Sequence, residues 1–367
     1  MKKTICILIL ATLILSLFSC GNSDTYPPVE STEEEMRTVM TMEIDGTEYS
    51  IKYELYRALF ASFAYKYDEG YASFWAKEEA EEARDLINRD IADAAADIYA
   101  VLHHANKIGY DPYSKDADRE VSRHIKNGVE GSAEDAIEGF GGDYDAYLEY
   151  LKTLGLNYST HVLLIRYALA YNYVITYYSG TVDPENPTQN MKEGALKYTK
   201  DDVYNFYAGD DCVRVSVVEI NADYIERNVA QARRDKIAGF SSSEEALHYA
   251  VSLTAGVPSD ILDGVVIGTM SLDSLYYGNV TEVAFDLDIN ETSPLLDVFT
   301  DTSEEYWILY RLEKTEDYFE SYYSDIENVY KAQKINELIY ETKAILLDSL
   351  KDAYILGSID LSEVYSK

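Results

Sequence analysis

Few side chains of this sequence have the type and spacing of a catalytic or metal site. Adjacent residues on a helix point about 100° apart, so His103 and His104 are not expected to share one metal ion. Cys212 is the remaining thiol of the expected folded part, and the neighbouring carboxylates of Asp210 and Asp211 would raise its pKa. We therefore expect no catalytic residue, no metal site and no cofactor. The histidines of the chain are His103, His104, His124, His161 and His248.

Acidic residues are too abundant to mark a site by themselves. The chain has 66 Asp and Glu against 31 Lys and Arg, which gives a formal net charge of −35. The acidic groups at 111–120 and 143–145 lack the spacing of an EF-hand loop, although calcium binding by the acidic surface stays open. No phosphate loop, nucleophile elbow or HExxH motif is present. Such a charge argues against nucleic acid and against an anionic lipid surface as partners, because both would be repelled.

The first residues predict export and anchoring. Lys2 and Lys3 precede an apolar run, 5–18, that is shorter than the roughly 20 residues of a spanning helix. We interpret 1–19 as a signal peptide. Its end, LFSCG, resembles a bacterial lipobox, which implies that Cys20 is acylated and holds the protein on the outer side of the cell membrane. Ordinary secretion with a coincidental cysteine is the alternative.

The remaining chain predicts an α+β protein that is mostly helical. Residues 20–40 would be the lipidated cysteine and an acidic linker, and 41–180 a helical domain that opens with a strand and a turn at Asp45-Gly46. A helix is expected to start near Ile51. Pro184 and Pro187 place a linker at 181–199.

The C-terminal half predicts a small α/β domain at 200–315, followed by a long helix within 316–367. The domain opens with the strand VRVSVVEI, 213–220, and closes with a hairpin whose second strand ends in EEYWILYRL. The apolar stripe of the last helix is too long for so small a domain to bury. We expect it to pack back on the helical domain.

This order of elements resembles the extracytoplasmic foldases of the SurA/PrsA kind. Those proteins join a helical chaperone domain to a parvulin-type peptidyl-prolyl isomerase domain. In the helical part, the resemblance is carried by 146–174. In the smaller domain it is carried by the opening strand, by the glycine-flanked turn 264–268, by the helix 280–287 and by the last strand, 304–312.

The resemblance also implies where a substrate groove would lie. The family's two strand histidines fall on Val217 and Trp307, its substrate-cradling methionine on Tyr276 and its ring-packing phenylalanine on Val280. Prolyl isomerisation needs no nucleophile, only a lower barrier to amide rotation. These four residues could still form an apolar cup, but the polar network of the family is missing.

The leading hypothesis is a lipid-anchored, extracytoplasmic folding factor: a chaperone or holdase of exported proteins, with isomerase activity reduced or lost. Its partners would be unfolded or newly exported polypeptides. The 35 tyrosines, against 10 phenylalanines, suit wide and adaptable contacts. An active isomerase with an aromatic pocket and a non-enzymatic surface-binding lipoprotein are the alternatives.

Overall fold

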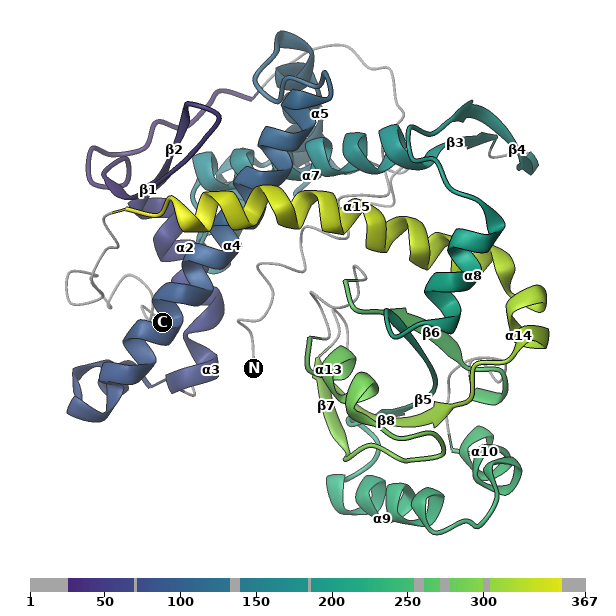
Figure 1. Ribbon diagram of the computed structural model, residues 1–367. Coiled ribbons are helices and arrows are strands. Elements are labelled where there is room, and N and C mark those ends of the chain that lie inside the picture. The colour runs from purple at the N-terminus through teal and green to yellow at the C-terminus, as the bar shows by residue number, and fades with distance from the viewer. Residues whose placement is uncertain are drawn as a thin grey trace. The chain divides into compact units, whose positions relative to one another are not determined.

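The computed structural model describes residues 26–68, 71–132, 139–183, 186–253, 261–270, 278–299 and 304–351. The predicted signal peptide and Cys20 lie outside these residues. The chain forms two compact units. The first, here called the helical unit, contains the chain up to Tyr177 and again from Leu338, and the second, the sheet unit, runs from Tyr178 to Glu337. The predicted fold class, α+β and mostly helical, is confirmed (Figure 1).

The helical unit opens with the hairpin of β1 (Thr38–Ile44) and β2 (Thr47–Lys52). The predicted turn is confirmed: Asp45 and Gly46 both have positive φ, of 51° and 75°, as a tight hairpin turn requires. The helix predicted near Ile51 begins at Tyr53 instead. Ile51 is fully buried in β2 opposite Met40, so sheet pairing extends further than the helical pattern suggested.

The body of this unit is a set of helices joined by short connections. Ser114 and Asp143 cap two of them by accepting backbone N–H groups at 3.2 Å and 3.0 Å, and Gly109 follows the longest with φ of 105°. Among the described residues, no helix combines the length and hydrophobicity needed to cross a bilayer. The helical elements are α2 (Tyr53–Phe63), α3 (Tyr65–Asp68), η2 (Ala72–Ala76), η3 (Glu78–Ala80), α4 (Glu81–Lys107), α5 (Lys115–Glu130), α6 (Tyr144–Thr153) and α7 (Tyr158–Ser179).

The C-terminal helix predicted within 316–367 is interrupted. α14 (Glu316–Ser321) is followed by its C-cap residue Tyr322, and α15 (Tyr323–Asp348) comes next. The part of α15 from Leu338 onward belongs to the helical unit. There the half-buried ion pairs of Lys343 fasten it to α4, with its ammonium nitrogen 2.7 Å from Asp93 and 3.0 Å from Asp97.

The sheet unit is built on one four-stranded antiparallel sheet of order β6-β5-β8-β7. β5 (Cys212–Asn221) and β8 (Glu304–Leu312) form its centre. Side chains alternate between two faces, so each face has its own hydrophobic cluster. One cluster includes residues of α9 and α10, and the other residues of α13 (Figure 1). The other elements are α8 (Lys200–Ala208), α9 (Arg227–Ala238), α10 (Ser243–Val251), β6 (Val265–Gly268), α13 (Gly278–Asp286) and β7 (Leu296–Phe299).

The segment predicted as an inter-domain linker, 181–199, contains regular structure. Gly180–Asp183 (β3) pairs with Asn186–Glu193 (β4) as a two-stranded antiparallel sheet. An isolated hairpin has no face that must be buried, so a polar sequence with prolines can form it without showing a hydrophobic pattern.

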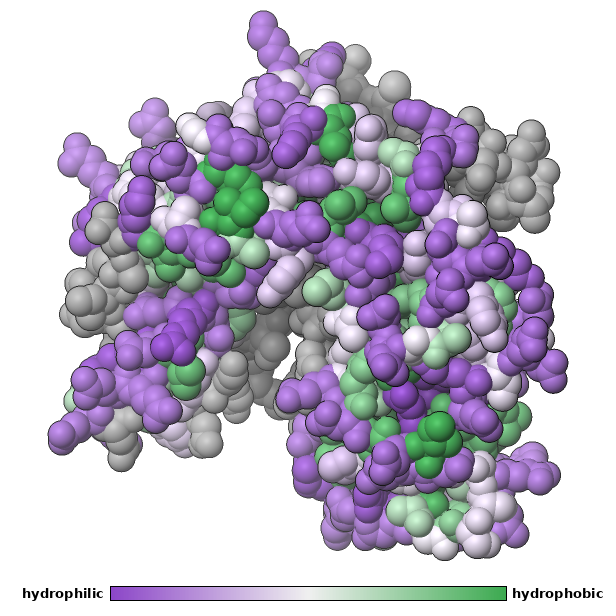
Figure 2. All heavy atoms as spheres, viewed as in Figure 1, coloured by the Kyte–Doolittle hydropathy of each residue, from purple (hydrophilic) through white to green (hydrophobic). Residues whose placement is uncertain are grey.

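The surface is mainly hydrophilic, as the acidic composition of the chain suggests. Figure 2 shows a face covered mainly by hydrophilic residues, with hydrophobic residues in small separate patches. The excess of carboxylates is thus accommodated in water, and the apolar residues are used mostly inside the two units.

Candidate functional site

Three of the four residues predicted to line a groove lie on one face of the sheet, here called the α13 face. Val217 on β5, Trp307 on β8 and Val280 on α13 share one hydrophobic cluster. Tyr276 lies outside the described residues. Val280 is 2% exposed and the central Leu309 is fully buried, whereas Val217 and Trp307 are partly buried. Val217 and Trp307 are therefore the predicted groove residues that keep some exposed surface, together with Val265, Ile267, Val283 and Phe285 of the same cluster.

Strand register fixes how these residues meet. Val217 pairs directly with Leu309, and Trp307 pairs with Glu219. Val217 and Trp307 are thus diagonal neighbours on the same face, a separation that an aromatic side chain can bridge. Alternate residues of β8 lie on opposite faces, because Trp307 and Leu309 pack with α13 while Ile308 belongs to the opposite cluster.

Polar groups on this face lie at its two ends. Beside Trp307, the indole N–H donates a 2.8 Å hydrogen bond to the Glu305 carboxylate. Glu219 pairs with Trp307 across the strands, and Glu305 accepts its N–H, so two partly exposed carboxylates border the tryptophan. At the other end the Arg311 guanidinium donates to the Ala284 carbonyl of α13 at 2.9 Å. This arrangement offers an aromatic surface and hydrogen-bond acceptors to a ligand.

The histidines lie elsewhere. His103 and His104 are on α4, His124 is on α5, His161 is on α7 and His248 is on α10. None of these elements contributes to the hydrophobic cluster of the α13 face as described. The face therefore has no histidine for proton transfer.

Cys212 is also unsuited to nucleophilic chemistry. It is fully buried at the start of β5, with its sulfur 3.6 Å from the carbonyl oxygens of Phe206 and Tyr207. Burial raises the pKa of the thiol to about 11. The prediction attributed a raised pKa to adjacent carboxylates; Asp211 does contribute, but desolvation is the larger cause.

A glycine shapes the neighbouring edge of the sheet. Gly264, just before β6, has φ of 73°, and a Cβ there would lie 2.5 Å from the Leu312 side chain and 2.8 Å from the Val215 carbonyl oxygen. A larger residue would push β6 away from β5. The glycine-flanked turn noted in the sequence is thus a packing requirement.

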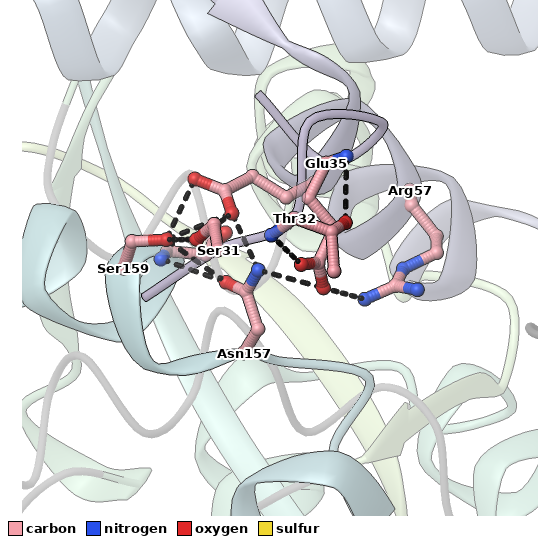
Figure 3. A network of polar contacts seen from close by, with 8 residues as sticks. Ser31, Thr32, Glu35, Arg57, Asn157 and Ser159 are labelled. Carbon is pink, nitrogen blue, oxygen red and sulfur yellow. Dashed lines mark hydrogen bonds and ion pairs between the residues drawn. The ribbon is translucent and has the colours of Figure 1, made fainter. Parts of the chain in front are cut away.

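A second polar arrangement lies in the helical unit and was missed by sequence reasoning (Figure 3). The Glu54 carboxylate of α2 is 6% exposed and accepts hydrogen bonds from Ser31, Ser159 and Asn157. The Ser31 and Ser159 hydroxyls are 2.6 Å apart. Asn157 also caps α7 by accepting the Thr160 N–H at 3.0 Å. We call these residues, with Glu35, the strap network.

Glu35 extends this network toward the surface. Its carboxylate accepts the Thr32 N–H at 2.7 Å and an Asn157 N–H at 3.3 Å, and it lies 3.7 Å from Arg57. Burial would raise the pKa of Glu35, but these hydrogen bonds and the Arg57 charge lower it below its usual value. The network therefore joins three segments that are far apart in the sequence, and its contacts favour the ionised form of Glu35.

No metal centre accompanies either arrangement. In the part of the chain that the structure describes, no three His, Cys, Asp or Glu side chains come together with the geometry of a metal site.

Comparisons with known proteins give structural neighbours only. No protein-family model matches the sequence, and no curated protein matches it significantly. Among solved structures, foldase protein PrsA of Streptococcus pneumoniae str. Canada MDR_19A has 13% identity and a TM-score of 0.28, over 83% of this chain and 91% of that chain. PrsA of Lactococcus lactis has 14% identity and a TM-score of 0.24, over 90% and 98%. Values this low do not place the chain in a family.

Proposed function

We propose that this chain is an extracytoplasmic folding factor that binds unfolded or newly exported polypeptides. The observation that carries the proposal is the α13 face, where a tryptophan and an apolar strand end are bordered by carboxylates and no histidine is present. Such a face can hold an apolar or prolyl side chain. The carboxylates can accept peptide N–H groups or pair with lysine and arginine.

Reduced or absent isomerase activity is part of this proposal. Amide rotation has a barrier of about 18–20 kcal/mol, and an isomerase must stabilise the twisted amide inside an apolar cup. Val280 and Leu309 are buried in the hydrophobic core, so they cannot contact a bound proline unless α13 moves. Of the four predicted groove residues, only Val217 and Trp307 are described as partly exposed, and this supports holding a polypeptide rather than rotating its bonds.

Isomerase activity is the second candidate function, and Trp307 is the observation that favours it. An aromatic ring at the accessible end of the face could pack on a prolyl ring and exclude water from the amide. Because no histidine lies on the face, catalysis of this kind would show no titration of a histidine between pH 5 and 8.

Two assays on purified 21–367 separate these functions. We expect the protein to suppress aggregation of a reduced, alkylated polypeptide and to leave proline-limited refolding rates unchanged. Trp307→Ala should weaken the suppression, whereas Tyr224→Ala, at a residue that is 84% exposed and outside the α13 face, should not. Refolding that is accelerated and then lost in Trp307→Ala would make the chain an isomerase. Suppression that is equal in both variants would contradict binding at this face.

Lipid anchoring at Cys20 completes the proposal and has its own test. A membrane fraction should contain the wild-type chain and incorporate labelled fatty acid into it. Cys20→Ala should release the chain and abolish the label. Membrane association that persists in this variant would contradict the anchor.

A further inference from the structure

The chain just after the predicted anchor is fastened to the helical unit. We call Tyr26 to Arg37 the strap. At its start, the Tyr26 ring stacks on Tyr144 of α6 with centroids 4.9 Å apart, and the Tyr26 hydroxyl donates to Glu130 of α5 at 3.2 Å. The Tyr144 hydroxyl donates in turn to the Pro27 carbonyl at 2.7 Å. The strap thus begins against α5 and α6.

The middle and end of the strap are held by the strap network and by backbone pairing. Ser31 and Glu35 bond to side chains of α2 and of the start of α7, as Figure 3 shows. The backbone N–H of Glu54 donates to the Glu35 carbonyl at 3.2 Å, and that of Tyr53 to the Arg37 carbonyl at 2.9 Å. The acidic segment predicted to be a free linker is therefore fixed from Tyr26 onward.

This fastening shortens the stretch of chain between Cys20 and the folded helical unit, here called the tether. Between Cys20 and Tyr26 lie residues 21–25, and a chain spans at most about 3.3–3.6 Å per residue, so the two Cα atoms can be separated by about 20 Å. With a free linker ending at Arg37, the limit would be about 60 Å. An acyl chain on Cys20 would hold Tyr26, and the surface around it, close to the lipid headgroups.

Aromatic side chains lie around Tyr26, and we call Tyr26, Phe140, Tyr144 and Tyr150 the aromatic corner. Tyr26, Phe140 and Tyr144 are partly buried against the core of the helical unit, and Tyr150 is exposed. Phe140 and Tyr150 have ring centroids 5.3 Å apart, and Tyr150 is 43% exposed. Tyrosine is enriched at membrane–water interfaces, because its ring is apolar and its hydroxyl can stay hydrated.

We infer that the aromatic corner rests on the surface of the lipid bilayer, with the α5 and α6 side of the helical unit facing the headgroups. The inference rests on the lipid anchor at Cys20 in the proposed function. Glu130, Asp143 and Asp145 border the corner, so the contact is shallow and is weakened by anionic lipid. Zwitterionic headgroups are the lipid surface that this corner fits.

Hydroxyl-radical footprinting tests this contact on the whole mature chain. A chain beginning at Cys20 is coupled through that thiol to a maleimide lipid in phosphatidylcholine vesicles; Cys212 is buried and does not compete. Oxidation of each aromatic residue is then compared by mass spectrometry between free and vesicle-bound protein. We expect Phe140 and Tyr150 to be protected several-fold, and the exposed Tyr113 and Tyr224 to be unchanged.

Two further samples test whether a lipid surface or a second copy of the chain covers the aromatic corner. A flexible Gly-Ser insertion between Asn22 and Ser23 should remove most of the protection, because the tether becomes long; undiminished protection would contradict a tether-imposed contact. Protection that also arises in concentrated protein without vesicles would identify a second copy of the chain as the occupant and overturn the proposal. Equal oxidation of Tyr150 in free and bound protein would overturn it as well.

The coupling is chemical, so this result does not depend on acylation in cells. Failure of cells to label Cys20 would remove the anchor from the proposed function while the vesicle measurement stood. Loss of Tyr150 protection with normal labelling would leave the anchor intact and refute only the contact.

Discussion

The two units bury different kinds of side chain. The helical unit encloses titratable groups: Glu54 in the strap network, His161 beside Tyr147, and Lys343 between two carboxylates. The α13 face of the sheet unit is apolar at its centre and keeps its carboxylates at the accessible end beside Trp307. Burial lowers the pKa of His161 and so makes the stability of the helical unit depend on pH, whereas an apolar face binds through shape and contact. We therefore assign polypeptide binding to the sheet unit and pH-sensitive stability to the helical unit.

Truncating the centre of the α13 face should have the largest effect. Leu309 is fully buried between β5 and α13, and removal of a buried leucine side chain costs about 2–5 kcal/mol. We expect Leu309→Ala to lower the free energy of unfolding of the sheet unit by that amount. Denaturant titration followed by fluorescence measures it, since Trp75 lies in the helical unit and Trp307 in the sheet unit. If Leu309→Ala shifted only the unfolding transition reported by Trp75, the assignment of Leu309 to the core of the sheet unit would be contradicted.

Acidification should destabilise the helical unit through His161. Burial lowers the pKa of His161 from 6.5 to about 4, and the neighbouring His124 adds to the shift. The unfolded chain binds the proton more readily, so this contribution is complete above pH 6.5 and is lost as pH falls toward 4. A shift of this size corresponds to about 3 kcal/mol.

Measuring unfolding free energy between pH 7 and 4 checks this sign. His161→Gln should flatten the dependence of the Trp75 transition over that range. The matched variant His248→Gln, at a side chain that is 68% exposed, should keep it. A profile unchanged by His161→Gln would contradict a buried neutral imidazole.

The ion pairs of Lys343 should contribute less. Its side chain is 9% exposed and its ammonium bonds to Asp93 and Asp97, so Lys343→Met removes two charge-assisted hydrogen bonds worth about 1.5–3 kcal/mol. The cost is reduced because the carboxylate of Asp93 stays largely in water. Lys152→Met is the control: its partner Glu149 lies on the same helix, and such a pair contributes about 0.3–0.5 kcal/mol. Equal effects of the two variants on Tm would contradict a clamp between α15 and α4.

The smallest effect concerns the cap of α7. Asn157 accepts the Thr160 N–H and donates to Glu54 and Glu35, and loss of such a cap costs about 1 kcal/mol. Asn157→Ala should lower Tm slightly and speed proteolysis of the strap. Asn228→Ala, at an exposed residue of α9 in the sheet unit, serves as a control. Unchanged proteolysis would show that the strap is held without this network.

Local pattern predicted much of the fold. The positive-φ turn Asp45-Gly46 and the two faces of β8 could be predicted because each depends on neighbours in the sequence. The start of α2 and the break at Tyr322 could not, since sheet pairing of Ile51 and packing of α14 override helical periodicity. The hairpin of β3 and β4 carries no hydrophobic alternation at all.

The candidate sites were predictable to different degrees. Val217, Val280 and Trp307 were placed by resemblance, and the structure brings them into one cluster, although the burial of Val280 could not be foreseen. The strap network depends on contacts between residues about a hundred positions apart in the sequence, such as Glu54 and Asn157. Local sequence patterns cannot predict such contacts. The one available signal was the Asn157-Tyr-Ser-Thr start of α7, a capping sequence.

A fluorescence titration tests the central claim most directly. An unfolded, proline-containing basic polypeptide is added to the wild-type chain and to Trp307→Phe, in which Trp75 is the remaining tryptophan. We predict a saturable change in the wild-type emission that is lost in the variant and has the same affinity at pH 6 and pH 8, because no histidine lies on the α13 face. A change that persists in Trp307→Phe, or none in the wild type, would contradict polypeptide binding at this face.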